Sequence, residues 1–581
     1  MKRILLLALF AVSLNAQTVT LKLIETSDIH GQLFPYDFIN DQPAQNSLAQ
    51  VFTYVKEERA KEDQHVILLD NGDILQGQPV VYYYNFERPD TTHILASIMN
   101  YMNYDAGSIG NHDIEAGHPV YDKLVDELNF PMMAANAVDE KTGEPYFKPY
   151  TIINKLGIKI AVLGLITPHI PHWLPEKIWE GMYFEDMIES AQKWVDIINE
   201  KENPDLLVGL FHAGLDHTYN NPTAEVYKNE NASQLVAERV DGFDIVFVGH
   251  DHQGWNKLIP NDNNKVVLIM GTKGYAGSIA EATVTLNRDE ENSKWESTVI
   301  GNIIDTKIYE PDEEFMSKFN YAFRETKDYV SRPIGELENP IAAQTAIFGD
   351  AEFSDLIHNI QLELTNADVS FTAPLSLNAE LKEGSIYVRD MFNLYKYENL
   401  LYTMELSGKE IKDYLEFSYS LWFNEMKSID DHLLLFEKDD DGNIIWSKRS
   451  GTPMLQNRYY NFDSAEGIEY TVDLSKQIGE RVTIHKFSDG RSFNENEIYK
   501  AAINSYRGNG GGNHLTKGAG NPHDELPERV ITSTEKDLRF YLMKWIENEE
   551  NIEIEKSNNW KVIPQDWYET AAEKDREILF K

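Results

Sequence analysis

The sequence contains no cysteine, and this absence removes several kinds of site from consideration. Without thiols there is no disulfide framework, no thiolate metal site and no cysteine nucleophile. Basic residues are also scarce, because 53 Lys and Arg stand against 95 Asp and Glu, a formal net charge of −42. Such a chain lacks the basic surface that binding of a nucleic-acid polymer requires. Small anions stay possible as ligands, since bound divalent cations can reverse the local field.

Long apolar runs are also lacking. Residues 4–12 form a short apolar run that follows Lys2 and Arg3 and precedes the small residue Ala16. This layout is typical of a secretory signal peptide, so we expect cleavage after Ala16 and a periplasmic or secreted protein. The alternative is a buried first strand or helix. The run is too short to span a bilayer, and we expect no stable membrane insertion.

The length of 581 residues predicts two or more domains, each with its own core. A hydrophobic fraction of 42% and an aromatic fraction of 11% are typical of a packed globular protein. We divide the chain into a signal peptide (1–16), a first domain (17–310), a connecting helix (311–333) and a second domain (334–581). The sequence does not determine the oligomeric state.

A repeated pattern organises the first domain, in which five apolar segments with strand character each end in polar residues. In open α/β folds, binding sites form beyond the carboxyl ends of the strands. Seven nitrogen or oxygen ligands, one of them shared, can hold two divalent metal ions about 3.5–4 Å apart. The candidate metal ligands are Asp28, His30, Asp73, Asn111, His212, His250 and His252.

Two pairs of candidate ligands are spaced two residues apart, Asp28 with His30 and His250 with His252. Side chains at this spacing lie on one side if the backbone stays extended, so each pair can contribute two ligands to one site. Taken singly, each residue has another interpretation. Asp28 and His30 could mark a solvent-exposed strand end, and Asp73 could be a solvated carboxylate in a tight turn.

His112 follows Asn111 directly and can carry a proton near neutral pH. Glu115 comes three residues later, close enough on a turn to hold the imidazole in one tautomer. Imidazole, carboxylate and amide ligands together suit Zn, Mn, Fe or Co. The sequence therefore predicts two divalent transition-metal ions without choosing among these elements.

The motifs resemble those of two known protein families. The first half is similar to the calcineurin-like metallophosphoesterases, and the second half to the 5′-nucleotidase family, in particular its 2′,3′-cyclic-nucleotide 2′-phosphodiesterase/3′-nucleotidases. This resemblance implies an α/β protein with a four-layer α/β/β/α N-terminal domain and an α+β C-terminal domain that binds the substrate. The motifs are Asp28-x-His30, Gly72-Asp73, Gly110-Asn111-His112-Asp113, His212-Ala213-Gly214, Gly249-His250-x-His252, Tyr470-Thr471-Val472-Asp473-Leu474, Asn504-Ser505-Tyr506-Arg507 and Gly510-Gly511-Gly512.

The resemblance also implies a role for each residue. His112 would face the phosphate, paired with Glu115, and Phe462 and Tyr506 would stack on the two faces of the nucleobase. From the residues alone, both aromatic side chains would be interpreted as core residues. One metal ion would be held by Asp28, His30, Asp73 and His252, and the other by Asp73, Asn111, His212 and His250.

The expected substrate follows from a departure from the family pattern. Some 5′-nucleotidases grip the 5′-phosphate with an arginine in the second domain, but residues 371–377 contain none. We therefore expect hydrolysis of 2′,3′-cyclic or 3′-nucleotides to nucleoside and phosphate, by metal-activated water. The alternatives are a 5′-nucleotidase or UDP-sugar hydrolase and, outside enzymes, a metal-stabilised nucleotide-binding module.

Overall fold

The computed structural model describes residues 17–219, 223, 226–288, 295–447 and 451–580, so the expected signal peptide lies outside the described residues. The internal contacts divide the chain into two compact units. The N-terminal unit runs to Ala322, and the C-terminal unit runs from Phe323 onward. Two short segments, Phe38–Asp41 and Ile170–Glu180, group with the C-terminal unit.

The first sheet of the N-terminal unit has six strands. Four adjacent strands of this sheet run parallel to one another. The remaining two form an antiparallel hairpin on its edge. Parallel strands deliver their carboxyl ends to the same side of a sheet, which matters for the site described below. In spatial order the strands are β16 (Trp295–Asp305), β15 (Ser278–Arg288), β1 (Gln17–Thr26), β4 (His65–Asp70), β5 (Ala106–Ser108) and β6 (Met132–Met133).

The second sheet also has six strands, and its four central strands are parallel. Those central strands are almost entirely apolar in sequence, as expected for strands covered on both faces. In spatial order the strands are β13 (Trp255–Pro260), β14 (Val266–Gly271), β12 (Ile245–Val248), β11 (Leu206–His212), β9 (Ile158–Ile166) and β8 (Tyr150–Lys155).

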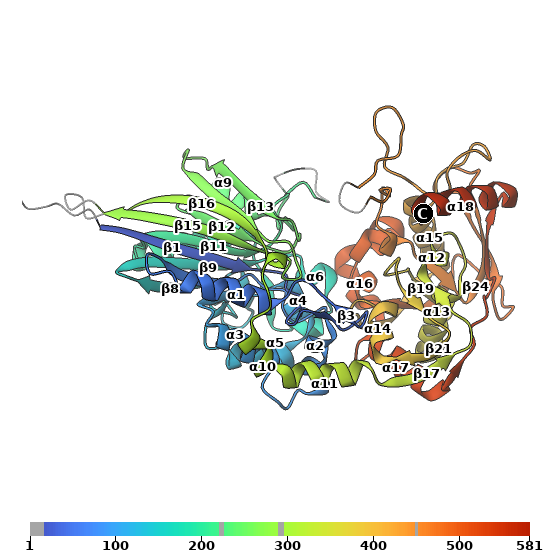
Figure 1. Ribbon diagram of the computed structural model, residues 1–581. Coiled ribbons are helices and arrows are strands. Elements are labelled where there is room, and N and C mark those ends of the chain that lie inside the picture. Colours follow the sequence, from blue (N-terminus) through green and yellow to red (C-terminus); the bar gives the residue numbers. More distant parts are fainter. Residues whose placement is uncertain (1–16, 220–222, 224–225, 289–294, 448–450, 581) are drawn as a thin grey trace, which may run out of the picture. The chain divides into compact units, whose positions relative to one another are not determined.

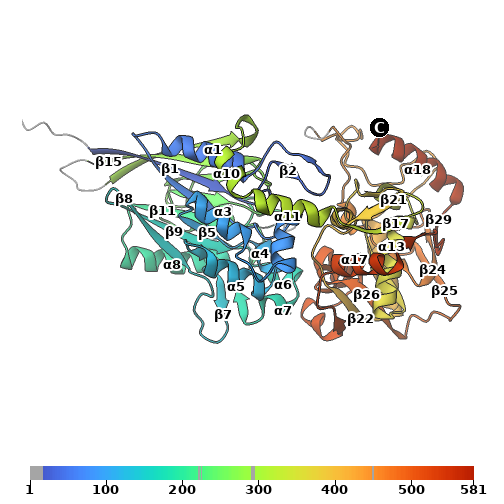
Figure 2. The same cartoon turned by 60° about the horizontal axis from the view of Figure 1, so that its bottom comes forward.

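The two sheets of the N-terminal unit pack face to face around a shared core. Leu23 and Leu69 from the first sheet and Val208 and Phe247 from the second are fully buried in one cluster. The other face of the second sheet is covered by α8 (Met187–Lys201) and α9 (Ser233–Arg239), and α1 (Leu48–Arg59) packs on β4 of the first. Most of these strands, with α1 and α9, are labelled in Figure 1, and α8 is labelled in Figure 2. The predicted four-layer α/β/β/α arrangement is confirmed.

The C-terminal unit is built from smaller mixed sheets with helices beside them, as the predicted α+β class requires. Its central sheet is β23 (Ser464–Glu466), β19 (Val369–Thr372), β26 (Ile498–Asn504), β22 (Leu401–Ser407) and β27 (Val530–Ser533). The unit has two three-stranded sheets. One consists of β21 (Gly384–Tyr387), β17 (Pro333–Leu337) and β28 (Asn551–Ile552). The other consists of β25 (Val482–Phe487), β24 (Ile468–Asp473) and β29 (Trp560–Ile563). The main helices are α13 (Glu352–Thr365), α14 (Val388–Leu394), α15 (Gly408–Trp422), α17 (Leu538–Glu549) and α18 (Gln565–Leu579).

Shorter elements complete the chain, and the rotated view in Figure 2 shows several of them. They are β2 (Tyr36–Asp37), β3 (Gln42–Pro43), α2 (Pro79–Tyr82), α3 (Ile94–Met102), α4 (Asn111–Glu115), α5 (His118–Glu127), β7 (Ala137–Asp139), α6 (Ile170–Trp173), α7 (Glu176–Trp179), β10 (Met182–Phe184), α10 (Glu313–Lys318), α11 (Asn320–Val330), β18 (Ile341–Ala342), α12 (Ala343–Ala346), β20 (Glu380–Leu381) and α16 (Ser505–Gly508).

The C-terminal segment, which has no clear pattern in the sequence, completes a sheet. Strand β29 pairs with β24 in parallel, and the Trp560 ring stacks on Tyr470 with centroids 5.7 Å apart and planes inclined by 4°. Both rings are nearly fully buried. Stacked aromatic pairs of this kind add stability beyond the area they bury. The tail is therefore an integral part of the core of the C-terminal unit.

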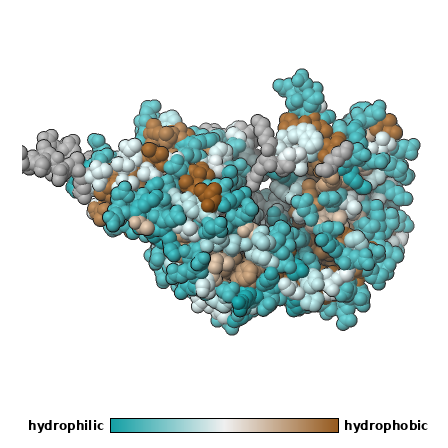
Figure 3. All heavy atoms as spheres, in the orientation of Figure 1, coloured by the Kyte–Doolittle hydropathy of each residue, from teal (hydrophilic) through white to brown (hydrophobic). Residues whose placement is uncertain are grey.

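The segment expected to be a single connecting helix consists of two, α10 and α11. Phe319 lies between them, and its ring packs on Phe315 and Tyr101 with centroid distances of 5.0 and 5.5 Å. Burial of this aromatic ring fixes the break between the helices. Among the described residues no helix is both long and apolar enough to cross a lipid bilayer. Hydrophilic residues predominate on the face drawn in Figure 3, in keeping with the acidic composition.

Candidate active site

The candidate ligands gather where the parallel strands of both sheets end. Residues after β1, β4 and β5 come from the first sheet, and residues at the ends of β11 and β12 come from the second. Because the two sheets pack face to face, their strand ends meet at one side of the N-terminal unit. The clustered residues are Asp28, His30, Asp73, Asn111, His212, His250 and His252.

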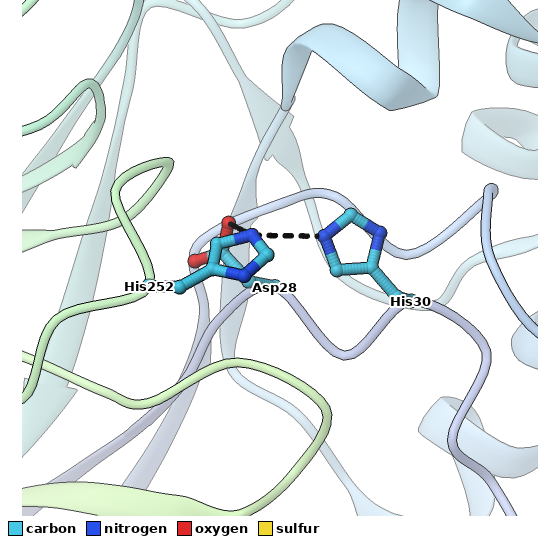
Figure 4. Close-up of side chains that lie close together, drawn as sticks. All are labelled: Asp28, His30 and His252. Carbon is cyan, nitrogen blue, oxygen red and sulfur yellow. Dashed lines mark hydrogen bonds and ion pairs between the residues drawn. The ribbon is translucent and has the colours of Figure 1, made fainter. Parts of the chain in front are cut away.

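The first group of ligands consists of Asp28, His30 and His252. Each offers one atom within 4.8 Å of the others. The Nε2 atoms of His30 and His252 are 3.1 Å apart, and His252 Nε2 lies 3.3 Å from Asp28 Oδ1. Figure 4 shows the two imidazoles and the carboxylate turned toward one another. Asp28 is fully buried and His30 nearly so.

The second group consists of Asp73, Asn111, His212 and His250. His212 Nε2 lies 3.1 Å from both Asp73 Oδ2 and Asn111 Oδ1. His250 Nδ1 lies 2.8 Å from the same Asn111 oxygen. An imidazole pair, a carboxylate and an amide oxygen thus surround one small volume.

Asp73 stands between the two groups. Its Oδ2 atom is 3.1 Å from His212 Nε2 and 4.0 Å from His30 Nε2, so one oxygen faces both sets of ligands. Its Oδ1 atom accepts a hydrogen bond from the backbone N–H of His112 at 2.8 Å, which fixes the carboxylate plane. The position suits a carboxylate shared between two cations.

The backbone at the ligands differs from the expected extended conformation. The φ angles of Asp28, His30, His250 and His252 are +52°, +48°, +73° and +55°, and that of Asp73 is +56°. These values lie in the left-handed region, which non-glycine residues enter rarely and at a cost in free energy. The backbone is therefore not extended at these residues, and the paired candidate ligands converge because each strand end turns sharply.

The ring nitrogens of His30 and His212 that point away from the cluster form hydrogen bonds, and these bonds test whether the cluster suits a cation. Nδ1 of His30 lies 3.1 Å from the carbonyl oxygen of Gln76, and Nδ1 of His212 lies 2.5 Å from that of Asn71. Carbonyl oxygens only accept, so each Nδ1 carries a hydrogen, and each Nε2 presents a lone pair to the cluster when the ring is neutral. Lone pairs and carboxylate oxygens that face one another at about 3 Å fit a shared cation.

The local field of the carboxylates supports the same interpretation. Burial lowers the pKa of His212, but the Asp73 carboxylate more than offsets this and raises the pKa to about 10. Without a metal ion, the field therefore retains a proton on His212. A cation bound at the same place would replace that proton, since metal ligation requires neutral imidazole.

Asp113 organises the loop that carries Asp73, and the sequence analysis assigned it no role. Its carboxylate accepts from the backbone N–H groups of Gly110, Asp73, Ile74 and Leu75 at 2.8–3.0 Å. A Cβ atom at Gly110 would lie 2.2 Å from Asp73 Oδ1, so only glycine permits this close approach. The signal in the sequence was an aspartate three residues after a glycine at the start of a short helix.

His112 and Glu115 lie together at the edge of the cluster. His112 Nδ1 is 2.5 Å from Glu115 Oε2, and the Glu115 side chain is 6% exposed whereas that of His112 is 27% exposed. Burial lowers the pKa of His112, but the carboxylates of Asp73 and Glu115 outweigh it and raise the pKa to about 9. The imidazole is therefore protonated at neutral pH in the metal-free site, with its Nε2 side available to a ligand.

The two aromatic residues expected to hold the base lie in different surroundings. Tyr506 begins the turn that leads to the glycine-rich segment and is half-buried. Phe462 is only 2% exposed, and its ring stacks on Trp422 with centroids 5.4 Å apart and planes inclined by 7°. This stacking places one face of the Phe462 ring against the core of the C-terminal unit. Its expected contact with a base stays a prediction.

Comparison with known proteins gives matches over both units. The calcineurin-like phosphoesterase family matches residues 21–254, and the 5′-nucleotidase C-terminal domain family matches residues 333–517. A 2′,3′-cyclic-nucleotide 2′-phosphodiesterase/3′-nucleotidase of Haemophilus influenzae is 26% identical over 96% of this chain and 89% of its own length. The trifunctional nucleotide phosphoesterase YfkN of Bacillus subtilis is 24% identical over 94% of this chain, which spans 39% of that relative.

Among solved structures, a Staphylococcus aureus protein in complex with α-ketoglutarate superimposes with a TM-score of 0.74 at 22% identity, covering 94% of this chain and 99% of the other. At this identity the likeness establishes the fold alone. The first family match includes all the clustered residues at the strand ends of the N-terminal unit, and the second lies within the C-terminal unit. The chain thus combines a calcineurin-like phosphoesterase domain with a 5′-nucleotidase C-terminal domain and is a metal-dependent phosphoesterase.

Proposed function

We propose that this protein hydrolyses 2′,3′-cyclic nucleotides and 3′-nucleotides to nucleoside and phosphate with two divalent cations. The observation that carries the proposal is the convergence of acceptor atoms on both sides of Asp73, with the paired His112 and Glu115 beside them. Residues 1–16 would serve as a signal peptide, which would make the enzyme periplasmic or secreted.

The proposed cation ligands divide into two sets that share Asp73. When bound, two divalent cations supply a water of lowered pKa and neutralise charge on the phosphate. Zn, Mn, Fe and Co are all compatible with ligands of this kind. One set is Asp28, His30, Asp73 and His252, and the other is Asp73, Asn111, His212 and His250.

His112 and Glu115 would handle the proton of the leaving group. Glu115 accepts the Nδ1 hydrogen of His112, which orients Nε2–H away from the carboxylate and toward the ester oxygen. Transfer of that proton prevents release of an unstable alkoxide, a contribution of about 10²–10⁴-fold in rate for general acids of this kind. Asn111, as an oxygen ligand beside His112, would also contact the phosphate.

The second unit supports this choice of ester. Residues 371–377, in and after β19, contain no arginine to form a bidentate pair with a 5′-phosphate. The Haemophilus influenzae relative carries a name that specifies 2′,3′-cyclic and 3′ esters, which supports the same choice. Tyr506 would stack on the base with its half-buried ring, as aromatic side chains do with any nucleobase.

Release of inorganic phosphate from 3′-AMP, 2′,3′-cyclic AMP and 5′-AMP, each with and without a chelator, tests the proposal. We expect turnover of the first two, little of 5′-AMP, and loss of all activity on chelation. Faster release from 5′-AMP or from a UDP-sugar would instead establish the alternative specificity. Tight nucleotide binding with no release from any substrate would identify a binding module.

A further inference from the structure

Glu230 lies behind the second group of ligands and was not singled out in the sequence. Its side chain is 10% exposed, and its Oε1 atom lies 3.3 Å from His250 Nε2. Its other oxygen, Oε2, lies 3.8 Å from His169 Nδ1. The carboxylate therefore sits in a nearly dry position between two imidazoles, one of which faces the cation cluster.

The segment that carries Glu230 is held rigidly. The Glu230 carbonyl oxygen accepts from Thr167 Oγ1 at 3.0 Å, which ties it to the end of β9. The next residue, Asn231, accepts from the backbone N–H of Gly214 at 3.1 Å, two residues after His212. The carboxylate is thus placed by the same strand ends that place the ligands, and not by a mobile surface loop.

The contact with Glu230 determines which nitrogen of His250 faces the cluster. A carboxylate only accepts, so His250 Nε2 must carry a hydrogen to bond with it. The lone pair then lies on Nδ1, which is 2.8 Å from the amide oxygen of Asn111. Two acceptor atoms so close repel each other unless a cation lies between them.

His250 differs from the candidate ligands His30 and His212 in the group that its second ring nitrogen contacts. Neutral carbonyl oxygens of Gln76 and Asn71 hold His30 and His212. His250 alone among these three is held by a negatively charged carboxylate. A carboxylate increases the basicity of the imidazole that donates to it and strengthens its bond to a metal.

We propose that Glu230 is a positioning residue that fixes the His250 tautomer and selectively tightens the cation held with Asp73, Asn111 and His212. The proposal deepens the proposed function, since it rests on the cluster binding two cations. It predicts that the two cations differ in affinity and that Glu230 controls the more tightly held one. Outer carboxylate partners of this kind typically contribute 10–100-fold to metal affinity.

Titration of the metal-free full chain with Co²⁺ in competition with a coloured chelator tests the proposal. We expect two sites in the wild type, and in Glu230→Ala a 10–100-fold weaker affinity at one of them, with the other unchanged. Glu230→Gln retains an acceptor oxygen without the charge, so its affinity should lie between the two. The visible Co²⁺ spectrum should change for the weakened site only, because His250 loses its fixed orientation.

Two controls separate this role from a merely structural one. His169→Gln removes the second imidazole that contacts Glu230 and should leave both Co²⁺ affinities within about threefold of wild type, well short of the effect of losing an outer carboxylate. Asp122→Asn disrupts another His–carboxylate pair of the same unit, His118 with Asp122 at 3.1 Å, and should change neither affinity. The midpoint of thermal unfolding of each metal-free variant reports whether it is folded.

The outcomes distinguish the inference from the proposed function. Binding of two Co²⁺ ions by wild type and by folded Glu230→Ala with equal affinities would overturn the role of Glu230 and leave the dimetal site standing. Equal loss at both sites would also overturn it, because the effect would not be selective. Failure of wild type itself to bind two ions would overturn the proposed function.

Discussion

His112 Nδ1 lies 2.5 Å from Glu115 Oε2, one turn away on the short helix α4. The pair is built into a five-residue helix whose first residue, Asn111, faces the cation ligands. The helix begins where β5 ends, and Asp113 anchors its first turn to the loop that carries Asp73. The proposed proton donor, its partner and a proposed metal ligand are thereby fixed to one another within one turn of backbone.

Removal of Glu115 should alter the pH dependence of hydrolysis. The pKa of His112 is raised above its ordinary value in part by Glu115, and the imidazole acts as an acid only below that pKa. Glu115→Gln should therefore shift the fall of kcat/KM at alkaline pH toward lower pH. His112→Ala should retain metal and lose about 10²–10⁴-fold in kcat. An unchanged alkaline limb in Glu115→Gln would remove Glu115 from the mechanism.

Asp73→Asn should disturb both cations at once. The carboxylate oxygen faces His212 and His30 from the two groups, and an amide in its place removes the shared negative charge. We expect the metal content of the purified variant, measured by elemental analysis, to fall at both positions. His212→Ala should instead lower occupancy of one position more than the other. Two tightly bound ions in Asp73→Asn would contradict the bridging role.

Asp463→Asn should destabilise the C-terminal unit and weaken nucleotide binding. Asp463 forms a two-pronged ion pair with Arg507 at 2.9 and 3.0 Å, and both residues are 2% exposed. Removal of one charge from a buried pair typically costs about 3–5 kcal/mol. Because Tyr506 precedes Arg507, KM should rise more than kcat falls. Urea unfolding and steady-state kinetics measure the two effects.

A matched control for this variant is available on the surface of the same unit. Glu469 and Lys486 pair at 2.9 Å with side chains 41% and 46% exposed. Exposed pairs contribute about 0–1 kcal/mol, so Glu469→Gln should leave the unfolding midpoint and KM nearly unchanged. Equal effects of Asp463→Asn and Glu469→Gln on stability and KM would show that the buried pair does not support the segment that carries Tyr506.

Asp355 should make the stability of the C-terminal unit fall as the pH rises. Burial and the neighbouring Asp350 raise the pKa of Asp355 to about 7, and its carboxyl accepts from the Ser557 backbone at 2.9 Å. Between its unfolded pKa of about 4 and pH 7 the folded state retains a proton that the unfolded chain releases, so stability declines over this interval.

Asp355→Asn should remove that decline, since the amide does not titrate and still offers an oxygen to Ser557. We expect the unfolding free energy of the variant to rise relative to that of wild type by about 2 kcal/mol between pH 4.5 and pH 7.5. This is roughly half of the free energy that corresponds to the full pKa shift, which allows for solvent screening. Urea denaturation at the two pH values measures it. Parallel pH profiles would mean that Asp355 does not titrate abnormally.

The positions of the ligands could be predicted from the sequence because they depend on a regular feature. Strands such as β9, β11 and β12 are buried on both faces and appear as continuous apolar runs, and polar residues at their ends mark the site. The local geometry could not be predicted. The left-handed turns at Asp28 and His250 have only a weak signature in residue type, since Asp and His enter this region more often than most residues but far less often than glycine.

Other features depend on contacts between distant segments. Glu230 lies twenty residues before His250 in a polar stretch, and nothing local distinguishes it from a solvated glutamate. Phe462 is covered by Trp422, forty residues away, so its burial follows from the packing of α15. Strand β29 depends in the same way on pairing with β24. Periodicity predicts elements, but contacts of this kind arise only when the elements pack.

The central claim is that two cations are bound on either side of Asp73, and elemental analysis combined with phosphate release tests it most directly. Protein purified without chelator, and chelated protein resupplied with a single metal ion, would be assayed for bound metal and for hydrolysis of 3′-AMP. We predict that activity returns as occupancy approaches two ions per chain. Full hydrolysis by protein that contains no metal, or no binding of any divalent ion by the folded chain, would contradict the account.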